Sequence, residues 1–142
     1  MTGVSDVLLE LDSKPELLCV ARDAVRSYLN CFDFSEERIM EVVLAVDEIC
    51  SNAVRHAYRG ESGHTYTLAM SCAKDWLEIV VADDGIPAPE RSVQEKGAPQ
   101  SLDDVTIGGY GIQIVRQVCD EVKFETREPK GNLVTVKVKC GQ

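Results

Sequence analysis

The chain has 142 residues, of which 44% are hydrophobic and 27% charged, and its formal net charge is −9. This is an ordinary globular composition, so we expect one domain over residues 1–142. The acidic balance argues against direct nucleic-acid binding, which needs a basic surface. No stretch approaches the roughly 20 apolar residues of a membrane span and no export signal opens the chain, so we expect a cytoplasmic protein without a membrane partner.

The chain contains six cysteines, and none is spaced as a C-x-x-C pair. Cys50 and Cys119 fall on apolar faces of their segments. This pattern favours free thiols in a reducing compartment over a disulfide framework or a zinc site.

The first predicted elements are a strand and a helix. Val7–Leu11 has the apolar character of a strand. Ser13 and Glu16 are spaced as a capping box, with Pro15 near the first helical position. We therefore expect a helix that continues to about Tyr28.

A second, longer helix is predicted from Ser35, which is a suitable N-cap because Glu36 and Glu37 follow it in the first turn. Its apolar residues recur at steps of three and four, as in a helix with one buried face. They are Ile39, Val42, Val43, Val46, Ile49, Cys50, Ala53 and Ala57.

The opposite face of this helix carries polar residues that could take part in catalysis or metal binding. Glu48 and Asn52 are one turn apart, with Arg55 on the same side and His56 at the edge of the apolar stripe. A carboxylate can act as a general base, and an amide oxygen is a hard ligand suited to Mg²⁺. By itself, such a pair is also what a solvated helix face carries.

The next segments alternate in the manner of strands. Thr65–Met70 and Trp76–Ala82 are joined by the short Ala73–Asp75 connection, which predicts a hairpin. The second strand stops at Asp83-Asp84-Gly85, where Asp83 is positioned to accept a hydrogen bond from an amino group such as that of adenine. A plain Asp-Gly turn explains this motif equally well when it is taken alone.

The last third of the chain adds a glycine turn, a helix and two strands. Gly108, Gly109 and Gly111 precede or open the helical run Ile112–Val118, where free backbone N–H groups could meet phosphate. Two alternating segments then flank a turn, Val122–Thr126 and Leu133–Val138. The order of elements predicts an α+β fold, a two-layer α/β sandwich with helices on one face of a mostly antiparallel sheet.

The three motifs in this order resemble the ATP-binding family that unites gyrase-type topoisomerases, sensor histidine kinases and certain small serine kinases. The likeness is greatest to the anti-sigma-factor serine/threonine kinases of bacteria, and it implies their Bergerat-type ATP-binding fold with ATP and Mg²⁺ as ligands. It rests on the helix that carries Glu48, on the Asp83 strand end and on the glycine turn, and it extends to the closing strand Gly131–Val136.

The resemblance implies a role for each matching position. Glu48 would be the general base, Asn52 the Mg²⁺ ligand and Asp83 the partner of the adenine amino group. The further nucleotide contacts would come from Arg55, His56, Gly85, Gly108, Gly109, Gly111 and Thr135. The patternless segment at about residues 86–107 would be a mobile lid over the triphosphate.

The resemblance also implies two protein partners, an antagonist with an acceptor Ser or Thr and a sigma factor or equivalent regulator, and it allows a homodimer. One departure concerns Pro87, which replaces the second glycine of the family's Asp-x-Gly-x-Gly pattern and has no N–H to donate. A kinase, favoured by Glu48, and a catalytically inactive nucleotide-gated binding module therefore both remain open. A detached histidine-kinase domain is disfavoured, because neither His56 nor His64 lies in a dimerisation helix.

Overall fold

A computed structural model describes residues 5–87 and 110–140 of the chain. In these ranges one five-stranded sheet has the order β1-β2-β3-β5-β4, and every neighbouring pair is antiparallel. Its strands are β1 (Val7–Asp12), β2 (Thr65–Ala73), β3 (Trp76–Asp83), β4 (Glu121–Thr126) and β5 (Asn132–Lys139).

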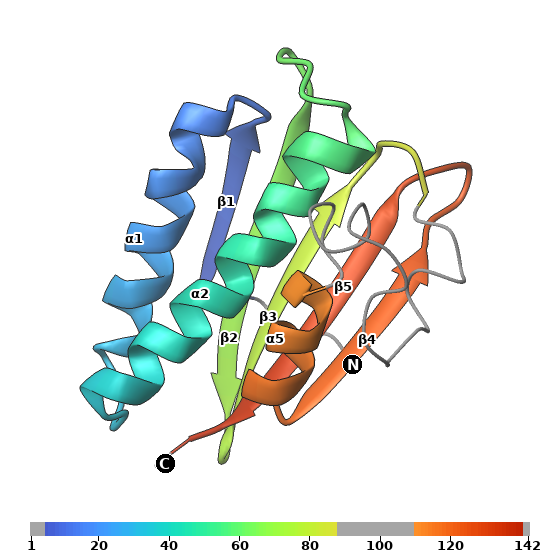
Figure 1. The fold of residues 1–142 in the computed structure, drawn as a ribbon. Coiled ribbons are helices and arrows are strands. Elements are labelled where there is room, and N and C mark those ends of the chain that lie inside the picture. The colour runs from blue at the N-terminus through green and yellow to red at the C-terminus, as the bar shows by residue number, and fades with distance from the viewer. Residues whose placement is uncertain (1–4, 88–109, 141–142) are drawn as a thin grey trace.

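The helices α1 (Leu18–Leu29), α2 (Glu36–Asn52) and α5 (Tyr110–Val118) cover one face of the sheet (Figure 1). A short 3-10 turn, η1 (Pro15–Leu17), precedes α1, and a π-turn, η2 (Ala53–Ala57), extends α2. This arrangement confirms the predicted α+β sandwich. No helix in the described ranges has the length and apolar character that a membrane crossing requires.

The core lies between the sheet and the helices. Alternate residues of β3 are buried, namely Leu77, Ile79 and Val81, and Asp83 continues the same series. Because side chains alternate between the two faces of a strand, Asp83 faces the helix layer. The strand thus places the Asp83 carboxylate at the end of an otherwise apolar core.

The long second helix begins where predicted and ends differently. The Ser35 side chain accepts a hydrogen bond from the Arg38 backbone N–H at 3.0 Å, which confirms the N-cap. Regular α-helix stops at Asn52, and the last apolar positions lie in the π-turn. The wider turn ends with the Ala57 carbonyl accepting the Ile86 N–H at 2.9 Å, a contact with the segment after β3 that local periodicity does not encode.

The predicted capping box at Ser13 is wrong. The residue before η1 is Lys14, without a side-chain cap bond. Ser13 is fully buried instead, and its hydroxyl donates to the Glu61 carbonyl at 2.6 Å and accepts the His64 N–H at 3.3 Å. A buried hydroxyl needs partners, and here the loop before β2 supplies them.

The cysteines of the described residues are free thiols, and Cys50 and Cys119 are buried as predicted. Burial raises the pKa of each of these two thiols to about 12, so both are protonated and inert near neutral pH. Cys72 and Cys140 lie with their Sγ atoms 3.4 Å apart.

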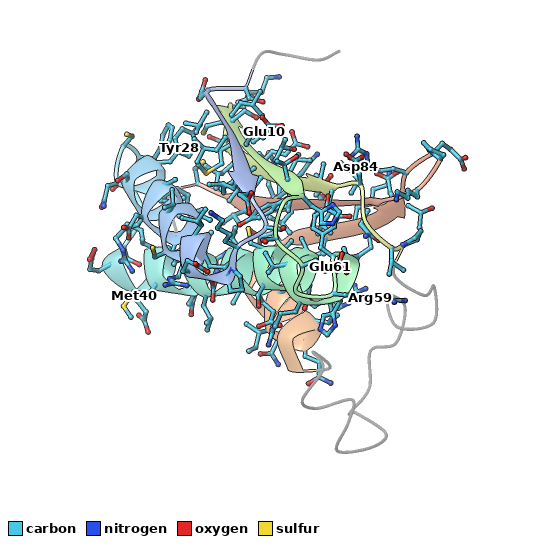
Figure 2. The ribbon with its side chains drawn as sticks, turned by 90° about the horizontal axis from the view of Figure 1, so that it is seen from above. Glu10, Tyr28, Met40, Arg59, Glu61 and Asp84 are labelled. Atoms are coloured by element: carbon cyan, nitrogen blue, oxygen red, sulfur yellow. The ribbon has the colours of Figure 1, made fainter. Side chains whose placement is uncertain are left out.

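The two ends of the helix layer differ in their surroundings. Figure 2 sets Tyr28 and Met40 at one end of the molecule and Arg59, Glu61 and Asp84 at the other. The C-terminal end of α2 therefore lies at the same end of the molecule as the end of β3.

Candidate functional site

The end of α2 holds the first two predicted site residues in a partly enclosed position. The Glu48 side chain is 23% exposed. The Asn52 side chain is half-buried, and its Oδ1 atom is buried without a hydrogen-bond partner among the described residues. A buried amide oxygen without a partner costs free energy, so its retention points to a ligand that supplies the missing interaction.

The π-turn that follows places two basic side chains. Arg55 Nη2 lies 3.8 Å from Glu48 Oε2, and the Arg55 side chain is 51% exposed. His56 is exposed and stands in the same turn. The structure thus brings Arg55 to Glu48, whereas no hydrogen bond or ion pair within residues 5–87 and 110–140 ties His56 to the site.

Asp83 is buried and well supported. Only 5% of the residue is exposed, and Oδ1 accepts hydrogen bonds from the Gly85 N–H at 2.9 Å and from Asn132 Nδ2 at 3.0 Å. Burial raises the pKa of Asp83 because loss of water outweighs the hydrogen bonds that favour the charged form. The bonds fix the carboxylate in one orientation, as a group that recognises one donor must be fixed.

Gly85 allows β3 and α2 to meet. A Cβ atom added at Gly85 would overlap the backbone and side chain of Ala57. The close approach is held by the Ile86 N–H bond to the Ala57 carbonyl. Gly85 therefore joins the strand end that carries Asp83 to the helix end that carries Asn52.

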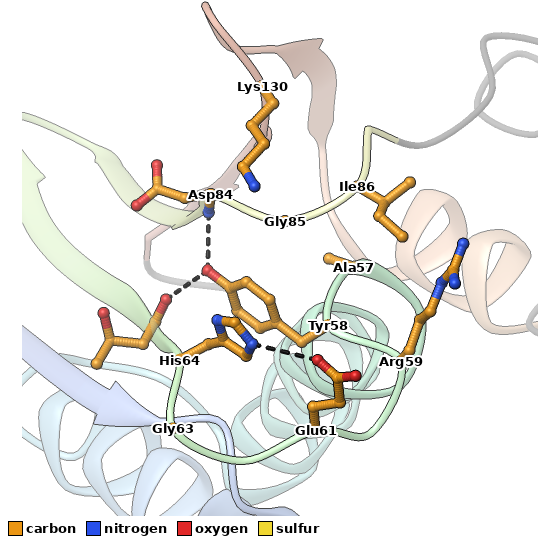
Figure 3. Close-up of a pocket in the computed structure, with 11 residues that line it drawn as sticks. Ala57, Tyr58, Arg59, Glu61, Gly63, His64, Asp84, Gly85, Ile86 and Lys130 are labelled. Carbon is orange, nitrogen blue, oxygen red and sulfur yellow. Dashed lines mark hydrogen bonds and ion pairs between the residues drawn. The ribbon is translucent and has the colours of Figure 1, made fainter.

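Tyr58 is a supporting residue that the motifs did not reveal. Its buried hydroxyl donates to the Thr65 carbonyl at 2.6 Å and accepts the Asp84 N–H at 2.8 Å, as the dashed lines in Figure 3 show. Its ring stacks on His64 with centroids 4.6 Å apart. One side chain thus ties the end of α2 to both β2 and β3, and the only sequence signal for it is an aromatic residue directly after the helix.

A pocket of about 470 Å³ opens beside this junction (Figure 3). Its wall includes Gly85 and Ile86 on one side and Arg59, His64 and Lys130 on the others. Glu48, Asn52 and Asp83 do not line it. The pocket therefore shares Gly85 with the predicted nucleotide site and does not include the other three residues.

The glycine turn is described in part. Gly111 is buried against Glu48, and a Cβ atom there would overlap the Glu48 carboxylate. Gly108 and Gly109 lie outside the described residues, as does the predicted lid except for Ile86 and Pro87, which are exposed.

The structure does not bring Thr135 to the site, which corrects the sequence prediction. In the ladder between β3 and β5, Asp83 pairs with Asn132 and Val80 pairs with Thr135. Asn132 shares the helix-facing side with Asp83, whereas Thr135 lies three residues further along and so points to the opposite face. Asn132 is the residue of β5 that reaches the site, and it also donates to the Ile86 carbonyl at 3.0 Å.

The site fits a nucleotide with a hard cation. Among the described residues no group of three or more His, Cys, Asp or Glu side chains could hold a metal by itself. The unpartnered Asn52 oxygen suits Mg²⁺, which is commonly held by one or two protein oxygens together with substrate phosphates. The buried Asp83 carboxylate suits a hydrogen-bond donor.

Comparison with known proteins is consistent with this geometry. Residues 11–138 match the family model of the histidine kinase-like ATPase domain. Serine-protein kinase RsbW of Bacillus pumilus (strain SAFR-032) is 30% identical over 123 residues, which cover 82% of this chain and 76% of that protein. Serine-protein kinase RsbW of Listeria innocua serovar 6a is 31% identical, with 83% and 78% covered.

Solved structures share the fold at lower identity. The SiaB–SiaC complex from Pseudomonas aeruginosa contains a chain that matches with a TM-score of 0.68 and 15% identity, covering 95% of this chain and 89% of that one. The mycobacterial sensor histidine kinase MprB matches with a TM-score of 0.56 and 16% identity, covering 94% and 98%. The family model and the RsbW relatives together show that the chain belongs to the histidine kinase-like ATPase domain family, among the serine-protein kinases related to RsbW.

Proposed function

We propose that this chain is an ATP-dependent serine/threonine protein kinase that phosphorylates a small antagonist protein and binds a sigma factor or similar regulator. The proposal is carried by the Asn52 oxygen, which is buried and has no hydrogen-bond partner among the described residues, one helical turn beyond a half-buried carboxylate, Glu48. This pair is what phosphoryl transfer requires of a protein, a cation ligand beside a base.

ATP would be held from both layers of the fold. Asp83 would accept the adenine amino group, with its carboxylate oriented by Gly85 and Asn132. Asn52 would ligate Mg²⁺, which would neutralise the charge of the phosphates. Arg55 and His56 would face the phosphates, and the backbone N–H groups at Gly108, Gly109 and Gly111 would bind them.

In the transfer step Glu48 would take the proton of the acceptor hydroxyl. The hydroxyl oxygen then bonds to the γ-phosphorus, and the bond from that phosphorus to the β,γ-bridging oxygen breaks. The products are the phosphorylated antagonist and ADP. A positioned general base typically contributes roughly 10²–10⁴-fold to such a rate.

A nucleotide-gated binding module without transfer activity is the second candidate. Pro87 favours it, because it stands in the segment next to Asp83 and has no backbone N–H for a phosphate or a closing lid. Such a module would switch protein partners by nucleotide occupancy alone. We expect a protein partner in either case, and we also infer a cytoplasmic protein that can form a homodimer.

The two candidates separate in one assay. Wild-type protein is incubated with γ-labelled Mg·ATP and with a candidate antagonist protein that carries an acceptor serine. We expect the label to move to that serine. Saturable Mg·ATP binding without transfer would favour the binding module, and absence of binding at millimolar nucleotide would contradict both.

A further inference from the structure

The Glu48 carboxylate is confined on one side by α5. Gly111 is the second residue of α5 and is buried. A Cβ atom at this position would overlap Glu48 Oε2, Cδ and Cγ. The absence of a side chain at Gly111 is therefore what leaves room for the carboxylate, since atoms in a packed interior cannot interpenetrate.

The same carboxylate also meets a cation. Arg55 Nη2 lies 3.8 Å from Glu48 Oε2. The two residues are seven positions apart, since Glu48 lies in α2 and Arg55 lies in the π-turn that follows it. The exposed Arg55 side chain attracts the acid without enclosing it.

We propose that Gly111 and Arg55 are positioning residues that fix the Glu48 carboxylate where α5 meets the end of α2, so that the start of α5 sets the placement of the base. This inference rests on the proposed kinase function for its catalytic consequence. A displacement of about 1 Å in a reacting group can cost roughly 10²-fold in rate. A methyl group at position 111 would force a displacement of the acid or of the helix.

A stability cycle tests the contact without reference to activity. Urea unfolding is measured for wild type, Gly111→Ala, Glu48→Ala and the double variant. Alanine is intrinsically favoured over glycine within a helix, so an unhindered Gly111→Ala would raise the unfolding midpoint. We expect it to lower the midpoint in the wild-type background and to raise it once Glu48→Ala has removed the side chain.

A kinetic cycle tests the positioning role. We expect Gly111→Ala to lower the rate constant for transfer, measured at saturating Mg·ATP, by roughly 10²-fold. Glu48→Asp shortens the acid by one methylene, so the same Gly111→Ala change should cost less in that background. Gln117→Ala, an exposed change on the same helix, is the matched control.

Arg55 gives an independent measurement on an exposed residue that does not endanger folding. Because Arg55 is also among the proposed phosphate contacts, Arg55→Gln should lower the rate constant for transfer by a larger factor than it raises the dissociation constant of Mg·ATP, and Arg55→Lys should restore most of the rate. A raised dissociation constant with an unchanged rate would assign Arg55 to phosphate binding instead and overturn its positioning role.

Two results would overturn the role of Gly111. One is additive stability effects in the urea cycle, and the other is wild-type transfer by Gly111→Ala. If the wild type binds nucleotide and never transfers phosphate, the proposed kinase function fails, while the urea cycle still decides whether Gly111 makes room for Glu48.

Discussion

The two halves of α2 present the same pattern of polar and apolar residues and have different surroundings. In the first half Met40 and Leu44 are exposed, and Glu41 pairs with Arg38 near the surface at 3.1 Å. In the second half the same polar face is partly covered. Glu48 lies against Gly111 of α5 and Asn52 keeps a buried oxygen without a partner among the described residues.

This difference distinguishes a surface carboxylate from a candidate general base on the same helix. Glu41 and Glu48 are both on the polar side of an amphipathic helix, and periodicity treats them alike. The neighbours decide, because Glu48 lies against Gly111 of α5, whereas Glu41 pairs with Arg38 near the surface. A partly enclosed carboxylate is held in place and shielded from water, as catalysis requires.

The largest effect is predicted for the rate of phosphate transfer when these two acids are substituted in turn. Glu48→Gln keeps the size of the side chain and removes the base, so phosphate transfer should fall by roughly 10²–10⁴-fold with Mg·ATP affinity retained. Glu41→Gln, the matched change in the first half, should leave transfer unchanged. Single-turnover transfer measurements on both variants give the comparison, and equal rates for Glu48→Gln and wild type would remove Glu48 from the catalytic role.

The second prediction extends the comparison to the strand that faces the end of α2. Asp83→Asn should weaken ATP binding by roughly 10–100-fold, because a charge-assisted hydrogen bond contributes about 1.5–3 kcal/mol. Titration calorimetry measures the loss. Asp75→Asn, in the exposed β2–β3 turn, is the control and should bind normally.

The same substitution has a pH signature in stability. The pKa of Asp83 is raised in the folded protein, so the native state binds the proton more tightly than the unfolded chain does. The resulting stabilisation is present below the unfolded pKa of about 4 and is lost as pH rises through the folded pKa. Relative to Asp83→Asn, the wild type should therefore lose stability as pH rises from about 4, and urea unfolding of both proteins measures the difference. A relative gain by the wild type would contradict the burial argument.

The third prediction separates binding from stability at Asn52. Asn52→Ala should weaken nucleotide binding only when Mg²⁺ is present, by at least the roughly 10-fold that a lost outer-shell partner costs a metal site. It should not lower the free energy of unfolding of the ligand-free protein, because it removes a buried oxygen that makes no hydrogen bond within the described part of the chain. Calorimetry with and without Mg²⁺, together with urea unfolding, tests both statements. An equal loss of affinity in EDTA would argue against a metal ligand.

The smallest effect is expected in the first half of α2. Leu44 is 53% exposed, so Leu44→Gln should change the free energy of unfolding by no more than about 0.5 kcal/mol. Urea unfolding measures this change. A loss above about 1 kcal/mol would mean that Leu44 packs against a part of the chain, and the contrast between the two halves would then weaken.

The sequence by itself determined the features that depend on residues close together in the chain. Alternating apolar residues predicted β3, and the same alternation places Asp83 on the side of Leu77, Ile79 and Val81. Steps of three and four predicted α2, and Ser35 predicted its start. These signals are reliable because a strand repeats every two residues and a helix every 3.6, whatever surrounds them.

Tertiary structure alone decided which polar side chains meet. The ladder between β3 and β5 selects Asn132 and turns Thr135 to the other face, because a shift by an odd number of residues reverses the side. Two other contacts likewise join distant segments. The Ser13 hydroxyl meets a carbonyl 48 residues away, and Gly111 meets Glu48, 63 residues away. Periodicity reports only whether a residue faces the core or the solvent, whereas these contacts depend on how the α2, β3, β5 and α5 segments pack together.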